Sequence, residues 1–135
     1  MAILVTPTNL QKLEYDVTTA AGPSHVTVVT GMISANVQAG SNSNQSGSFK
    51  ALVDPQLNPG QFIKATATAS MNSLFFQLGV TPGFAVWRID EVEATFDDES
   101  GRVQLRVDAT VGSSGNNSNT QLVAIGFQVT TLAKI

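Results

Sequence analysis

The sequence predicts an all-β protein: an antiparallel β-sandwich of about seven or eight strands, jelly-roll-like or a related Greek key. The strongest observation is the run 102–111, in which every odd residue is apolar and every even residue is polar. Successive strand side chains point to opposite faces, so this run is a strand with one face on a core and one in water. Val- and Thr-rich runs recur between turn residues. The 135 residues are typical of one domain, and we expect a single sandwich domain over residues 1–135.

The N-terminal run 10–19 allows two interpretations. Leu10, Leu13 and Val17 have helical spacing, whereas Leu13, Tyr15 and Val17 have strand spacing. The strand is favoured because the residues that follow are poor helix formers. Residues 24–38, rich in Val, Ile and Thr, predict a second strand. The Ser-, Asn- and Gly-rich stretch 40–47 predicts a loop.

The middle of the chain predicts two further strands. Residues 49–53 are mostly apolar and end at Asp54-Pro55, and a second break follows at Asn58-Pro59-Gly60. Residues 63–70 alternate Ile or Ala with Lys, Thr or Ser, which predicts a strand with a small-residue face. The short apolar run 74–78 cannot be assigned from its periodicity, and residues 79–83 predict a turn.

Residues 84–96 and 102–111 predict a hairpin with an irregularity in its first strand. Its apolar residues change from odd to even positions near Asp90-Glu91, which predicts a β-bulge there. A turn at 98–101 places Asp97 opposite Arg102 and Glu93 opposite Arg106, and we expect both to form cross-strand ion pairs. The same register sets Glu91 against Asp108, an unfavourable pair that also favours a bulge.

The last strand is predicted over residues 120–132, after a second Ser/Asn/Gly-rich loop at 112–119. One face carries Val123, Ile125, Phe127 and Val129. The other face is apolar in its first half, and we predict an oligomer interface there, formed by Leu122, Ala124 and Gly126. A strand that is apolar on both faces is usually covered on both faces.

The composition bounds the function classes. Only 13% of residues are charged, against about 25% in ordinary globular domains, and Ser, Thr, Asn and Gln carry the polar load. The seven Lys and Arg residues are dispersed and the net charge is −3, which argues against a nucleic-acid partner. A polar surface with little charge suits a homo-oligomer or a glycan ligand.

The expected location follows from what the sequence lacks. The chain has no cysteine, so disulfides and thiolate chemistry are excluded. Its N-terminus has no basic region ahead of its short apolar run, so we expect cytoplasmic synthesis without a signal peptide. No run approaches the roughly 20 apolar residues of a membrane helix, so no membrane partner is expected. The final location stays open.

Candidate catalytic groups are few. His25 is the single histidine, and we interpret it as a solvent-exposed residue at a strand entry. The concentration of acidic residues at 90–99 could form a calcium site or a glycosidase carboxylate pair, but pairing with arginines is the better interpretation. Trp87 and Phe84 could form a sugar platform, although Trp87 shares its face with Ile89 and is assigned to the core. We therefore expect no enzyme activity, cofactor or metal.

The asparagines of the two polar loops are the candidate ligand contacts, because amide groups can read hydroxyls through paired donors and acceptors. These candidates are Asn42, Asn44, Asn116 and Asn117. Two functions follow from the sequence. The first is a non-enzymatic, self-associating β-sandwich that serves as a structural or interaction module. The alternative is a lectin-like carbohydrate-binding module that uses these loops.

Overall fold

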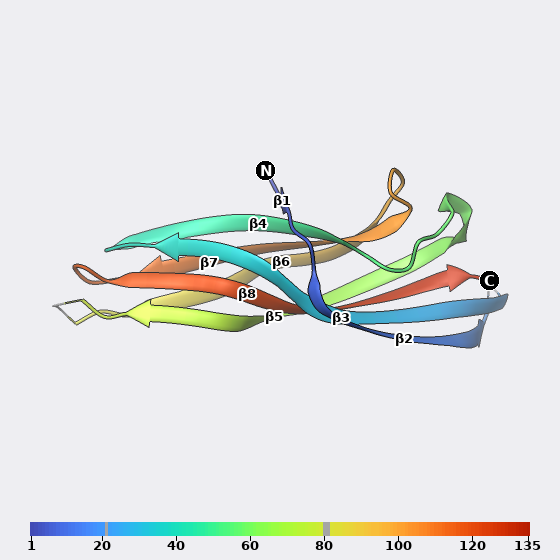
Figure 1. Cartoon of the computed structure of the whole chain (residues 1–135), viewed down its shortest axis with the longest axis horizontal. Coiled ribbons are helices and arrows are strands. Elements are labelled where there is room, and N and C mark those ends of the chain that lie inside the picture. Colours follow the sequence, from blue (N-terminus) through green and yellow to red (C-terminus); the bar gives the residue numbers. More distant parts are fainter. Residues whose placement is uncertain (21, 80–81) are drawn as a thin grey trace.

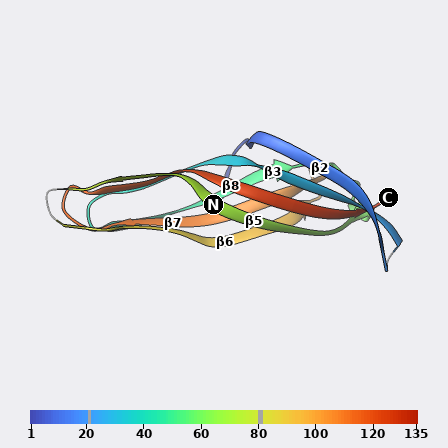
Figure 2. The ribbon, with the colours of Figure 1, turned by 90° about the horizontal axis from the view of Figure 1, so that it is seen from below.

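The chain folds into two layers of long strands, as shown by a computed structural model that describes residues 1–20, 22–79 and 82–135 (Figures 1 and 2). A 3₁₀ turn, η1 (Pro59–Gln61), is the one helical element among these residues, and no helix there is long and apolar enough to cross a membrane. The strands are β1 (Ile3–Leu4), β2 (Thr8–Thr19), β3 (Gly22–Ala39), β4 (Ser43–Val53), β5 (Phe62–Gln77), β6 (Ala85–Asp97), β7 (Arg102–Ser113) and β8 (Asn119–Lys134). The predicted all-β sandwich is confirmed.

The strands form two four-stranded sheets. Sheet I has the order β1-β4-β7-β6 and sheet II the order β2-β3-β8-β5. Neighbours are antiparallel except β1 and β4, which are parallel. The hairpins β2–β3 and β6–β7 each stay within one sheet, while the other connections cross between sheets. The jelly-roll description is not confirmed by this order.

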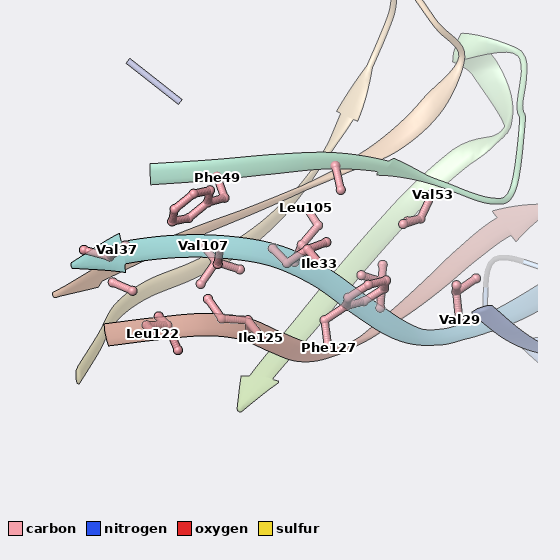
Figure 3. Close-up of a cluster of buried hydrophobic side chains, with 14 of the residues drawn as sticks. Val29, Ile33, Val37, Phe49, Val53, Leu105, Val107, Leu122, Ile125 and Phe127 are labelled. Atoms are coloured by element: carbon pink, nitrogen blue, oxygen red, sulfur yellow. The ribbon is translucent and has the colours of Figure 1, made fainter. Parts of the chain in front are cut away.

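The core lies between the sheets and comes from alternate residues of the central strands (Figure 3). Leu105 and Val107 of β7 face Ile33 of β3 and Ile125 of β8, and all four are completely buried. The predicted alternation of residues 102–111 is therefore confirmed. The small-residue face of 63–70 packs against the same cluster. Burial of this apolar surface is the main stabilising contribution.

Several element boundaries differ from the prediction. The expected loop 40–47 is mostly strand, because β4 begins at Ser43 and pairs with β7 from that residue on. Ser46 Oγ lies 2.8 Å from Thr110 Oγ1 on the neighbouring strand, so hydroxyl side chains there serve cross-strand pairing. The unassigned run 74–78 mostly completes β5. The expected turn 79–83 includes residues 80 and 81, which lie outside the described residues.

The β6–β7 hairpin has the predicted register, with Asp97 opposite Arg102 and Glu93 opposite Arg106. The bulge is also confirmed: β6 has one extra residue, Asp90, between Ile89 and Glu91. The expected ion pairs are wrong. Arg102 Nη1 instead lies 2.7 Å from Asp54 Oδ1, and Arg106 Nε lies 3.3 Å from Asp108 Oδ1. Long arginine side chains reach beyond the directly opposite residue.

The assignment of Leu122 to the outer face is wrong. Leu122 is fully buried in the core, and its neighbour Val123 is 41% exposed. The cause is a register shift, since β3 has four steps between Ile33 and Val37 whereas β8 has three between Ile125 and Leu122. Because β8 is one residue shorter than β3 over this stretch, the side of β8 that faces the core changes there. Odd-numbered residues face the core from Ile125 onward, and even-numbered residues face it at Leu122 and before. Of the predicted interface residues, Ala124 and Gly126 remain half-buried outside the core cluster.

Candidate functional site

The turn from β3 to β4 and the turn from β7 to β8 lie at one end of the sandwich, beside the last residues of β5 and the first residues of β6 (Figure 1). Asn42 joins the two turns: its Oδ1 accepts a hydrogen bond from Gly115 N at 2.8 Å, and its Nδ2 lies 3.5 Å from Asn116 Oδ1. Asn117 N donates to Ser41 Oγ at 2.7 Å. Asn42 and Asn117 both have positive φ, a conformation that asparagine tolerates better than most residues. These asparagines therefore hold the turns together.

A surface hollow of about 420 Å³ opens beside these turns on the outward side of sheet I. Its floor is Gly112, where a Cβ would collide with Oδ1 of Asn44. We call it the end hollow. It is lined by Asn42, Asn44, Phe84, Val86, Arg88, Thr110, Gly112, Ser113 and Ser114.

The bulge residue Asp90 organises one wall of the end hollow. Its Oδ1 accepts a hydrogen bond from Arg88 Nε at 2.5 Å, and its Oδ2 accepts one from Thr110 Oγ1 at 2.5 Å. The bond from Thr110, followed by the one from Arg88, lowers the pKa of Asp90 below its ordinary value. The bulge thus supplies a carboxylate that orients the guanidinium and hydroxyl beside the hollow.

The end hollow combines apolar and hydrogen-bonding groups. Phe84 is 65% exposed and Val86 is 41% exposed, so both present apolar surface to solvent. Asn44 contributes an exposed amide and Arg88 an exposed guanidinium. An exposed ring beside amide and guanidinium donors suits a polyhydroxylated ligand with one apolar face, such as a sugar.

The structure brings only two of the four predicted asparagines, Asn42 and Asn44, to the end hollow. Asn116 and Asn117 are exposed in the next turn and do not line it. Arg88 and Thr110 also line the hollow but are not among the residues predicted from the sequence. A signal was present, because extending the hairpin past the bulge pairs Arg88 with Thr110 on the outward face.

Trp87 points the opposite way, toward the core, as predicted. Its indole Nε1 donates a hydrogen bond to the backbone oxygen of Gln121 at 3.1 Å. Its ring meets Phe76 edge-on, with centroids 6.5 Å apart. The indole thereby joins β6 of sheet I to β5 and β8 of sheet II.

His25 was expected to be a solvent-exposed residue, but two acidic side chains of β2 contact its ring. His25 Nδ1 lies 2.6 Å from Asp16 Oδ1, and Nε2 lies 3.4 Å from Glu14 Oε1. The hydrogen bond to Asp16 is the main cause that raises the pKa of His25 above 6.5. No group of three His, Cys, Asp or Glu side chains among the described residues could hold a metal ion.

We expect His25 to make stability depend on pH. The pKa of His25 is higher in the folded chain than in the unfolded chain, so protonated His25 stabilises the fold. This stabilisation is complete at pH values below the unfolded pKa, and it disappears as the pH rises through the folded pKa. The melting temperature of the wild type should therefore exceed that of His25→Gln most at about pH 5.5, and this difference should shrink by about pH 8.5. Asp16→Asn should weaken the same trend. A difference that stays constant across this range would contradict the assignment.

Comparisons of the chain with protein-family models, curated proteins and solved structures find no match. The end hollow and the outward faces of the two sheets are the surfaces of this chain on which a ligand or a partner could bind.

Proposed function

We propose that this protein is a non-enzymatic, self-associating β-sandwich module, the building unit of a larger assembly. The observation that carries this proposal is the unequal charge on the two outward faces. The outward face of sheet I holds most of the charge, namely Lys50, Arg88, Asp90, Glu91, Glu93, Asp97, Arg102, Arg106 and Asp108. The outward face of sheet II has Lys64 and Lys134 as its charged residues within the described part of the chain.

The outward face of sheet II also exposes apolar side chains near its β2 margin. Leu13 is 62% exposed and Tyr15 is 46% exposed. They lie opposite Val28, which is half-buried, and Val26, which is 8% exposed. Leu132 of β8 continues the row beside Val26. We call these five residues the outer apolar patch. Protein interfaces are depleted in charge and enriched in aromatic residues at their centre. Burying charged groups costs free energy, so the outward face of sheet II is less costly to bury in a contact than that of sheet I.

The solution mass tests the proposal directly. Light scattering behind a sizing column, over a dilution series, is expected to show a species heavier than one 14.2 kDa chain that dissociates on dilution. Leu13→Ser with Tyr15→Ser should shift dissociation to higher concentration by at least about tenfold. A wild type that is monomeric throughout the series would overturn the proposal.

A matched control separates this patch from exposed apolar surface in general. Ile3 and Leu4 of β1 are 59% and 60% exposed, and they belong to the other sheet. Ile3→Ser with Leu4→Ser should therefore leave association unchanged. If both double variants lost association equally, the outer apolar patch would not be the contact. Circular dichroism of each variant establishes that it is folded.

The end hollow supports a second candidate function, carbohydrate binding. Phe84→Ala and Asn44→Ala should each weaken a reproducible signal on a glycan array by about tenfold, because the ring and the amide supply the contacts. Phe75→Ala and Asn72→Ala are matched controls, since Phe75 is 47% exposed and Asn72 is exposed, both on β5 outside the hollow. Absence of any glycan signal, or an equal loss in the controls, would remove this candidate.

A further inference from the structure

The strand β2 is the terminal strand of sheet II, and its outer edge is unpaired among the described residues (Figure 1). It is 12 residues long, and nearly all of its side chains are exposed. Its pairing with β3 is irregular between Thr8 and Gln11 and continuous from Gln11 to Thr19. A long, regular edge strand presents a row of backbone donors and acceptors that can pair with another strand. Proteins commonly protect such edges, so an open edge of this length is a surface for strand addition.

The side chains of β2 divide into two kinds by face. Lys12 and Glu14 lie on the side of sheet II that faces sheet I, and Leu13 lies on the outward side opposite Val28. Lys12 Nζ is 3.9 Å from Glu14 and 3.7 Å from Asp54, and the three carboxylate and ammonium side chains are 43–45% exposed. Glu14 Oε1 also lies 3.4 Å from His25 Nε2. All of these contacts are long, so the charged ends of Lys12 and Glu14 stay accessible to an approaching strand.

We infer that β2 pairs in antiparallel orientation with β2 of a second copy of this chain, around a two-fold axis at Leu13. This inference rests on the proposed self-association and specifies its surface. In this register Leu13 meets its own copy, Lys12 of each chain lies opposite Glu14 of the other, and Gln11 lies opposite Tyr15. Opposite charges directly across an antiparallel pair attract, and apolar residues pack on the other face.

Self-complementarity is the reason that the occupant is a second copy. A two-fold axis repeats every contact, so Lys12 of each copy meets Glu14 of the other and the interface gains two Lys–Glu pairs. Moving the register by two residues would instead place either Glu14 or Lys12 against its own copy, depending on the direction, and both are like-charge contacts. Sheet II of one copy would join sheet II of the other into one continuous sheet across the dimer, with both outer apolar patches on the same side.

A single introduced cysteine tests the register, because the natural chain contains none. In directly opposite cross-strand pairs the Cβ atoms are about 5 Å apart, within reach of a disulfide after small adjustment. Leu13→Cys treated with diamide should give a covalent dimer at concentrations where the wild type associates. Leu4→Cys is the matched control, because Leu4 is 60% exposed and Leu13 is 62% exposed. It should give little covalent dimer. Equal cross-linking of both would overturn the inference.

Charge reversal provides a second, independent test of the same pairing. Lys12→Glu alone and Glu14→Lys alone should each raise the dimer dissociation constant by about tenfold, because each creates two like-charge contacts. Mixing the two variants should restore association, since every contact in the mixed dimer then joins Glu to Lys. The double variant should also associate like the wild type.

The outcomes separate the inference from the proposed function. A monomeric wild type would overturn both. A wild type that associates, combined with charge variants that associate equally well and no Leu13→Cys dimer, would overturn the β2 pairing and leave self-association standing. Restoration in the mixture together with the cross-link would support the two-fold contact at Leu13.

Discussion

Replacing Leu122 with alanine is expected to lower the free energy of unfolding by about 2–5 kcal/mol. Leu122 is fully buried and belongs to the core cluster, so truncation both removes apolar contacts and leaves a cavity between the sheets. In a chain of this size the melting temperature should fall by roughly 6–15 °C. Chemical denaturation and thermal unfolding, followed by circular dichroism, measure the two quantities.

The neighbouring residue is the control for this prediction. Val123 is 41% exposed, and Val123→Ala should change the free energy of unfolding by no more than about 0.5 kcal/mol. Uninterrupted alternation from Ile125 would reverse the order of the two effects. A larger loss for Val123→Ala than for Leu122→Ala would therefore contradict the phase reversal in β8.

Replacing Thr131 with valine is expected to stabilise the protein by about 1–2 kcal/mol. Thr131 of β8 lies opposite Thr27 of β3, both are essentially buried, and neither Oγ1 atom has a hydrogen-bond partner among the described residues. Valine has nearly the same shape and removes the cost of burying an unpaired hydroxyl. The midpoint of urea denaturation should rise, with its slope unchanged.

The same substitution at Thr110 should have the opposite sign. Thr110 is 8% exposed, and its hydroxyl contacts both Asp90 and Ser46. Thr110→Val removes the hydroxyl that both partners contact, and we expect the midpoint of urea denaturation to fall. If both Thr→Val variants moved stability in the same direction, the hydrogen bonding of the hydroxyl would not be the deciding factor.

The sequence was sufficient to predict the sandwich and the β6–β7 hairpin because these depend on local information. Alternation assigns each residue of 102–111 to a face, and the apolar phase change placed the bulge near Asp90-Glu91, where the structure has it at Asp90. Leu122 was misplaced because its burial depends on a register shift between β8 and β3, which are far apart in the sequence. A shift of that kind leaves no turn residue or charge pattern in the strand itself.

The candidate site was predicted only in part, for a different physical reason. Asn- and Ser-rich composition indicated loops, but backbone pairing with β7 makes residues 43–47 of the expected loop 40–47 part of a strand. Asn44 consequently lines a sheet surface, while Asn42 is used to join two turns. Phe84 was singled out only together with Trp87, which points to the core. Arg88 joins the site because the hairpin register pairs it with Thr110, which composition does not reveal.

The hydrogen bond from the indole of Trp87 to Gln121 has a practical consequence. Trp87 is the single tryptophan of the chain, and its ring lies where β6 meets strands of sheet II. The fluorescence of Trp87 therefore reports on the contact between the two sheets. An event that loosens this end of the sandwich shifts the emission to longer wavelength, whereas docking at the distant β2 edge leaves the spectrum unchanged.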